Sequence, residues 1–143
     1  MSVRSILRNK SDHVVTAEPA TTAEEAAWMM RQHNIGALMI VEDGQVLGLL
    51  TQRDLANGLA EHGTALALRE VRTLMRRNFV SVSPSETAKR VMALMTLHRV
   101  TYIPVIDGEK LVGIVSIGDV VKDRLGDLEV ESNVLRDAYI AVH

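Results

Sequence analysis

Apolar residues along the chain follow a pattern that occurs twice. In each copy, two nearly continuous apolar runs are separated by a turn that contains an Asp-Gly pair. Continuous rather than alternating apolarity predicts strands that are covered on both faces, and the Asp-Gly pair is typical of a tight hairpin turn. The predicted strands are Ala37–Val41, Val46–Leu50, Tyr102–Ile106 and Leu111–Val115.

Helices are predicted on either side of each strand pair. Before the first pair, Thr22 has the properties of a helix N-cap, and Glu25 three residues later completes a capping box. Ala26, Met29 and Met30 then share one face of the helix. Each copy therefore has the order β-α-β-β-α. The other predicted elements are the strands Val14–Thr16 and Phe79–Val82, the helices Leu55–Glu61 and Ala88–His98, and a helix that begins at Asp119.

Corresponding residues of the two copies lie 65 positions apart. This offset pairs Gly48 with Gly113 and Asp54 with Asp119. Upstream, VRSIL at residues 3–7 matches VRTLM at residues 71–75 with an offset of 68, so the first copy carries three extra residues near residues 9–13. Such self-similarity indicates one structural unit built twice. Two units of this size are expected to share a core, because each would be marginal alone.

The repeats predict a mixed α/β (α+β) fold. We expect a first repeat with an N-terminal helical segment at residues 1–63, a helical connector at 64–78, a second repeat at 79–124 and a C-terminal amphipathic helix at 125–143. In the last segment, apolar residues recur at alternating three- and four-residue steps. This spacing suits a helix packed on its own domain and a helix used in dimerisation equally well.

Composition narrows the classes of function. The net charge of −2 and the scattered basic residues give no reason to expect nucleic acid or an acidic membrane as a partner. The absence of cysteine excludes disulfides and thiolate chemistry. No apolar stretch approaches the roughly 20 residues of a membrane span, and the first residues lack a signal-peptide pattern, so we expect a cytoplasmic protein. His33 and His98 have no carboxylate at ligand spacing, and no metal site is expected.

One motif suggests a family. The sequence Gly-x-x-Thr/Ser-x-x-Asp ends the second strand of each pair, and a proline precedes the first helix of each copy. With the Met-rich helix, these features resemble the tandem CBS (cystathionine-β-synthase-type) domain pair over about residues 3–125. The segment HRVTYIPVID at residues 98–107 looks like the matching segment of the regulatory gamma subunits of AMP-activated kinases. The resemblance implies a stand-alone Bateman module with pseudo-two-fold symmetry, two clefts for adenosine-containing ligands, and dimers formed through helices.

The two motifs define a first cleft beside Thr51 and Asp54 and a second cleft beside Ser116 and Asp119. A carboxylate just inside a helix can accept hydrogen bonds from the vicinal hydroxyls of a ribose. The helix N-terminus suits a phosphate, to which the Thr or Ser hydroxyl adds a donor. The alternative is that both aspartates only cap their helices, which is favourable without a ligand. The matched spacing favours ligand contact, and the two roles are compatible.

The resemblance also implies that each cleft receives phosphate contacts from the other repeat. The first cleft then receives His98 and Arg99, with Arg53 beside them, although these cations also suit a solvated helix C-terminus. The second cleft receives His33 and Asn34 without a fixed positive charge, and Gly118 replaces the arginine. This predicts that the first cleft binds the more phosphorylated ligand, or binds it more tightly. The adenine is expected beside backbone groups of Thr16, Leu38, Ser81, Ile103 and Pro104.

We therefore expect the chain to be a regulatory module and not an enzyme. It would bind AMP, ADP or ATP in one or both clefts and signal to a regulated protein through a conformational or dimer change. NAD(H) and S-adenosylmethionine are further candidates because they share the adenosine part. The alternative is an interaction module with empty clefts. An enzyme is disfavoured, since the sequence offers no nucleophile paired with a base and no metal cluster.

Overall fold

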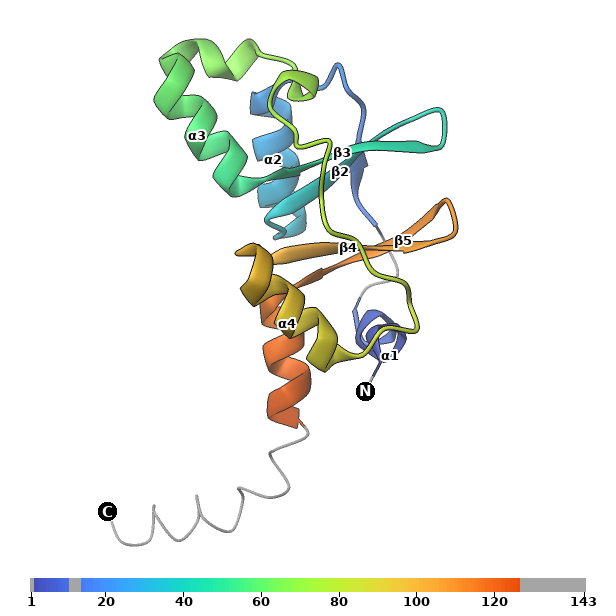
Figure 1. Ribbon diagram of the computed structural model, residues 1–143. Coiled ribbons are helices and arrows are strands. Elements are labelled where there is room, and N and C mark those ends of the chain that lie inside the picture. The colour runs from blue at the N-terminus through green and yellow to red at the C-terminus, as the bar shows by residue number, and fades with distance from the viewer. Residues whose placement is uncertain (1, 11–13, 127–143) are drawn as a thin grey trace, which may run out of the picture.

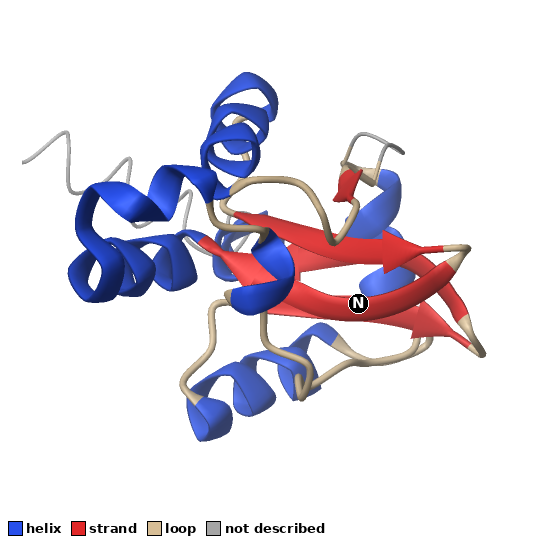
Figure 2. Ribbon diagram, turned by 90° about the horizontal axis from the view of Figure 1, so that it is seen from above, coloured by secondary structure: helices blue, strands red, loops and turns tan. Residues whose placement is uncertain are grey.

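The computed structural model describes residues 2–10 and 14–126. Two repeats stack so that their strand pairs lie next to each other, and helices flank the strands (Figures 1 and 2). The first repeat contains β1 (Thr16–Ala17), α2 (Ala23–His33), β2 (Ala37–Glu42), β3 (Gln45–Thr51) and α3 (Gln52–His62). The second contains α4 (Ala88–His98), β4 (Tyr102–Asp107), β5 (Lys110–Ser116) and a helix that starts at residue 117 and is described to residue 126. The mixed fold class is confirmed.

Three shorter helices lie outside this plan. They are α1 (Val3–Arg8) and the 3-10 helices η1 (Gly63–Leu68) and η2 (Val71–Thr73). The latter two occupy the segment that was expected to be a helical connector. The C-terminal helix predicted for residues 125–143 lies outside the described residues from residue 127 onward.

The two sheets differ in one strand. In the first repeat the order is β1-β2-β3, with β1 parallel and β3 antiparallel to β2. In the second repeat only β4 and β5 pair, and the predicted strand Phe79–Val82 is wrong. It is reduced to one bridge, in which Val82 N donates to Pro104 O at 3.0 Å and Ile106 N donates to Val82 O at 2.9 Å. The next bond of a parallel ladder would need an N–H on Pro104, which proline lacks.

The segments that precede the repeats cross over. We call residues 2–10 and 70–78 the lead-in segments. Val3 N donates to Glu86 O at 2.8 Å, so the N-terminal segment packs against the second repeat, although the sequence grouped it with the first. Val71 N donates in the same way to Thr21 O of the first repeat at 2.7 Å. Val3 and Val71 are both fully buried, so each repeat is completed by the segment that leads into the other.

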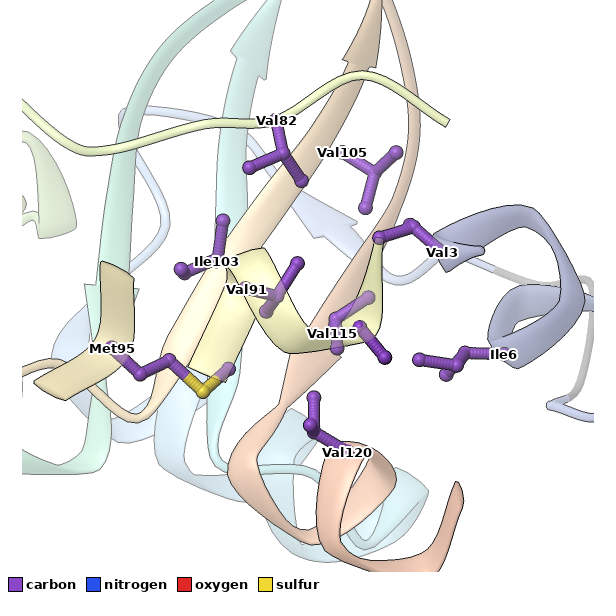
Figure 3. Packing of buried hydrophobic residues seen from close by; sticks show 10 residues of the cluster. Val3, Ile6, Val82, Val91, Met95, Ile103, Val105, Val115 and Val120 are labelled. Carbon is purple, nitrogen blue, oxygen red and sulfur yellow. The ribbon is translucent and has the colours of Figure 1, made fainter. Parts of the chain in front are cut away.

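Each repeat has its own core, and a third cluster joins them. The core of the second repeat gathers side chains from α1, α4, both strands and the last helix (Figure 3). Between the repeats, Ala37, Met39 and Leu49 are buried against Tyr102 and Ile114. The expected shared core is therefore present, and it brings the ends of β3 and β5 to the boundary between the copies, where the candidate clefts lie. Among the described residues, no helix is long and apolar enough to cross a membrane.

Candidate functional site

Two cavities lie where the sequence predicts the two clefts. The first has a volume of about 580 Å³ and is lined by Thr51 and Arg53 from the start of α3 and by His98 and Arg99 from the end of α4. The second has a volume of about 780 Å³. It is lined by Ser116 and Asp119 and by His33 and Asn34 from the end of α2. Each cavity thus combines a helix start from one repeat with a helix end from the other.

Asp54 is held by three donors. Its Oδ2 accepts hydrogen bonds from Thr51 N at 2.9 Å and Thr51 Oγ1 at 3.0 Å, while Asp54 N donates to Thr51 Oγ1 at 3.3 Å. This is a complete capping box. Its Oδ1 accepts from Arg76 Nε at 2.9 Å, and the carboxylate side chain is only 6% exposed. The capping role is therefore filled, and both carboxylate oxygens have partners.

Asp119 is more accessible. Its Oδ2 accepts from Ser116 N at 2.8 Å and from Lys10 Nζ at 2.6 Å, and Asp119 N donates to Ser116 Oγ at 3.1 Å. Lys10 Nζ also donates to Ile114 O at 2.8 Å. The Asp119 side chain is 20% exposed. Asp119 lines the second cavity, and among the described residues its Oδ1 has no hydrogen-bond partner.

The helix ends that face the cavities have unusual backbone geometry. Asn34 and Arg99 follow α2 and α4 with φ angles of 52° and 54°, in the left-handed region. Asparagine is a common residue there, whereas arginine pays a steric cost on the order of 1–2 kcal/mol. Local strain at a cavity is often retained for function. This geometry places Arg99 in the lining of the first cavity.

The expectation that the second cleft lacks a fixed positive charge is wrong. Arg4, Arg8 and Lys10 all line its cavity, together with the acidic Asp107 and Asp119. The sequence argument missed these cations because it grouped the N-terminal segment with the first repeat. Gly118 does not line this cavity, whereas Arg53, its counterpart, lines the first. The difference in charge between the clefts is therefore smaller than the sequence predicts, although the first cavity is lined by Arg53, Arg76 and Arg99 without an acidic residue. Tighter phosphate binding in the first cleft stays a prediction.

The strand residues that were named for adenine contacts lie next to residues that line the cavities. Leu38, Ile103 and Pro104 are fully buried in the cores, and none of them lines either of the two cavities. Their neighbours Ala37 and Tyr102 line a cavity instead. Successive strand residues point to opposite faces, so an error of one residue exchanges core and cleft.

Thr16 and Ser81, which precede the first helix of each repeat, show the same shift of one residue from the cavity linings. Thr16 and Ser81 are exposed and line neither of the two cavities, whereas Val15 lines the second and Val80 the first. Thr16 lies instead in a separate shallow depression of about 440 Å³ near the hairpin turns.

Three residues that the sequence argument missed belong to this region. Arg76 and Lys10 bind the two aspartates, and Tyr102 lines both cavities. The repeated VRSIL and VRTLM segments were the available signal for the first two, since each cation follows one of these segments within three residues. Among the described residues, no group of three or more His, Asp or Glu side chains could hold a metal ion.

Comparisons with known proteins agree with this architecture. A model of the CBS domain matches residues 3–61 and again residues 69–126. The chain is 31% identical over 139 residues to the CBS domain-containing protein YhcV of Bacillus subtilis, which covers 97% of this chain and 99% of that protein. The crystal structure of the CBS-domain containing protein ATU1752 from Agrobacterium tumefaciens superposes with a TM-score of 0.84 at 38% identity, covering 87% of this chain and 99% of that one.

A further similar structure contains ligands. The CBS domain pair of protein MJ0100, solved in complex with 5'-methylthioadenosine and S-adenosyl-L-methionine, has a TM-score of 0.79 at 28% identity. It covers 89% of this chain and 98% of that one. The duplicated fold, the two clefts between its copies and the two family matches lead to one assignment: the chain belongs to the CBS domain family and forms a tandem CBS pair.

Proposed function

We propose that the chain is a regulatory module that binds an adenosine-containing ligand between its two CBS repeats. The observation that carries the proposal is the pair of helix-start carboxylates at the boundary between the repeats. Asp119 lines the second cavity, whereas Asp54 does not line the first and lies behind its hydrogen-bond partners Thr51 and Arg76, which do. A carboxylate suits the vicinal hydroxyls of a ribose, and nearby arginines suit phosphate. The ligands of the MJ0100 pair, 5'-methylthioadenosine and S-adenosyl-L-methionine, support the adenosine class.

The candidates within this class are AMP, ADP, ATP, NAD(H) and S-adenosylmethionine. Arginines at both cavities favour a ligand with phosphate groups, through Arg53 and Arg99 in the first and Arg4 and Arg8 in the second. S-adenosylmethionine is the second candidate, favoured by the similar structure that contains it. The module is proposed to act without catalysis, by favouring one conformational or dimeric arrangement recognised by a regulated protein. A ligand shifts such an equilibrium only by its different affinity for the two arrangements.

We expect one of these ligands to raise the melting temperature of the purified protein. A ligand that binds only the folded state, at about a hundred times its dissociation constant, adds roughly 2.7 kcal/mol to the free energy of unfolding. Thermal unfolding with each ligand measures this shift. In the Asp54→Asn, Asp119→Asn double variant, which keeps the side-chain volumes, the shift should be lost. No shift for nucleotide-free protein with any ligand would favour an interaction module with empty clefts.

A homodimer is also proposed. Ile117, Val121 and Leu125 recur every fourth residue on the last described helix and are 49%, 44% and 61% exposed. This spacing puts them on one face. The inner face of the same helix packs with α4 in one core, through Val120 and Met95 (Figure 3). The exposed stripe thus lies on a well-supported helix, which suits a contact with a second copy.

We expect a Val121→Asp, Leu125→Asp variant to be monomeric while the wild type is dimeric, because two buried carboxylates would oppose the contact. Light scattering coupled to gel filtration measures the mass. Lys122→Asp on the same helix is the control, since it adds an acidic side chain outside the stripe. A monomeric wild type would contradict the proposal.

A further inference from the structure

Each cleft carboxylate is bound by a cation from a lead-in segment. Arg76 Nε lies 2.9 Å from Asp54 Oδ1, and Lys10 Nζ lies 2.6 Å from Asp119 Oδ2. Both cations follow the repeated VRSIL or VRTLM sequence, and both reach the repeat that their own segment does not lead into. One oxygen of each carboxylate that could accept a hydrogen bond from a ribose is thus already bound by a cation.

The two cations are held with different strength. The main chain of Arg76 pairs with Leu49 in both directions, each N–H···O bond measuring 2.9 Å, so the backbone beneath the guanidinium is fixed to β3. Its partner Asp54 is almost fully buried. Removing one member of a pair that includes a buried charge leaves that charge uncompensated, which is strongly unfavourable. A ligand that displaces Arg76 must overcome this cost.

Lys10 is held less firmly. Its ammonium binds Ile114 O and Asp119 Oδ2 at the end of a flexible side chain. The side chain of Asp119 is 20% exposed, against 6% for that of Asp54, and an ion pair whose carboxylate is this accessible contributes less. A lysine that leaves Asp119 is readily solvated. Among the described residues, Asp119 Oδ1 also accepts no hydrogen bond, so a hydroxyl can approach it before any resident contact is broken.

We infer that Arg76 and Lys10 determine which cleft accepts the ribose, and that the second cleft is occupied first. Arg76 stays bound to Asp54 and keeps a vicinal diol from reaching that carboxylate. Lys10 leaves Asp119 when a vicinal diol binds there. This inference rests on the proposed binding of an adenosine ligand, and it names the cleft and the residues that select it. It reverses the order of occupancy that the sequence predicts from charge.

The experiment is a calorimetric titration with AMP, with 2'-deoxy-AMP as the probe for the diol. For the wild type we expect the tightest site to bind 2'-deoxy-AMP at least about tenfold more weakly, since a hydrogen bond to a charged group is lost. Asp119→Asn should weaken the tightest AMP site by at least about tenfold, because the charged acceptor of the ribose hydrogen bond is lost. Asp54→Asn should weaken it by less than about twofold, because Asp54 does not contact the ribose of that site. Thermal unfolding of each variant checks that it is folded.

Variants of the cations give a second test that does not depend on the folding of Asp54→Asn. Arg76→Met should add or tighten a second AMP site, because it opens Asp54. Lys10→Met should raise AMP affinity, because it removes the cation that competes for Asp119, and Lys89→Met on α4, which lines neither cavity, is the matched control. Wild-type binding that is lost in Asp54→Asn and kept in Asp119→Asn overturns the inference, as does Lys10→Met weakening AMP as much as Asp119→Asn. Absence of any AMP binding or thermal shift by the wild type overturns the inference, and if the other adenosine ligands also fail, it overturns the proposed function as well.

Discussion

Leu38→Ala will lower the free energy of unfolding by about 2–5 kcal/mol, the range for removing a buried leucine side chain from a well-packed core. Leu38 is fully buried in the core of the first repeat, with Ile40, Leu50 and Val71 around it. Because the surrounding residues come from two strands and a lead-in segment, they cannot all move to fill the space. Denaturant unfolding followed by circular dichroism measures the change.

The matched control is Leu68→Ala, which makes the same change at a side chain that is 79% exposed. Its effect should stay within about 0.5 kcal/mol. The comparison also separates two roles for Leu38, because the sequence placed it beside the adenine and the structure places it in the core. A stable Leu38→Ala protein that has lost only ligand affinity would contradict the core position.

The elements that follow from local rules were predictable from the sequence. Thr22 accepts the hydrogen bond of Glu25 N at 3.2 Å, as an N-cap should, and Ala26 and Met30 are buried on the predicted face of α2. The hairpins β2-β3 and β4-β5 end at the predicted turns. The 65-residue repeat was the main reason, because each predicted helix or strand was supported by the matching segment of the other copy. The family and the fold class followed from the same repeat.

The errors arose where distant segments meet. Nothing local in VRSIL indicates that α1 packs on the second repeat, and without that contact Lys10 cannot be placed beside Asp119. Arg76 lies 22 residues from Asp54, a separation with no periodic signal. The adenine contacts require the strand register to one residue, because Leu38 and Ala37 face opposite sides of the strand. The sequence therefore located the two clefts but did not show that Lys10 and Arg76 bind the aspartates beside them.

Gly36→Ala will destabilise the protein by about 1–3 kcal/mol, the usual cost of overpacking a filled site. A Cβ on Gly36 would overlap the hydroxyl oxygen of Tyr102 and lie 2.8 Å from its Cζ. The backbone at Gly36 does not have a positive φ angle, so the cost comes from side-chain contacts and not from backbone strain. Tyr102 is the nearer of these contacts, and Gln52 Oε1 lies 3.0 Å from the added Cβ. The position that corresponds to Tyr102 in the first repeat is Ala37, so this aromatic contact exists on one side of the pseudo-symmetric pair.

The sign should reverse when the tyrosine is removed. In a Tyr102→Ala background, Gly36→Ala is expected to be neutral or to stabilise by up to about 1 kcal/mol, because alanine reduces the conformational entropy of the unfolded chain. A double-mutant cycle from denaturant unfolding measures this coupling. Equal destabilisation in both backgrounds would mean that Tyr102 does not occupy the space above Gly36. Since Tyr102 lines both cavities, a large coupling would show that a residue bordering both clefts is packed tightly against the backbone at Gly36.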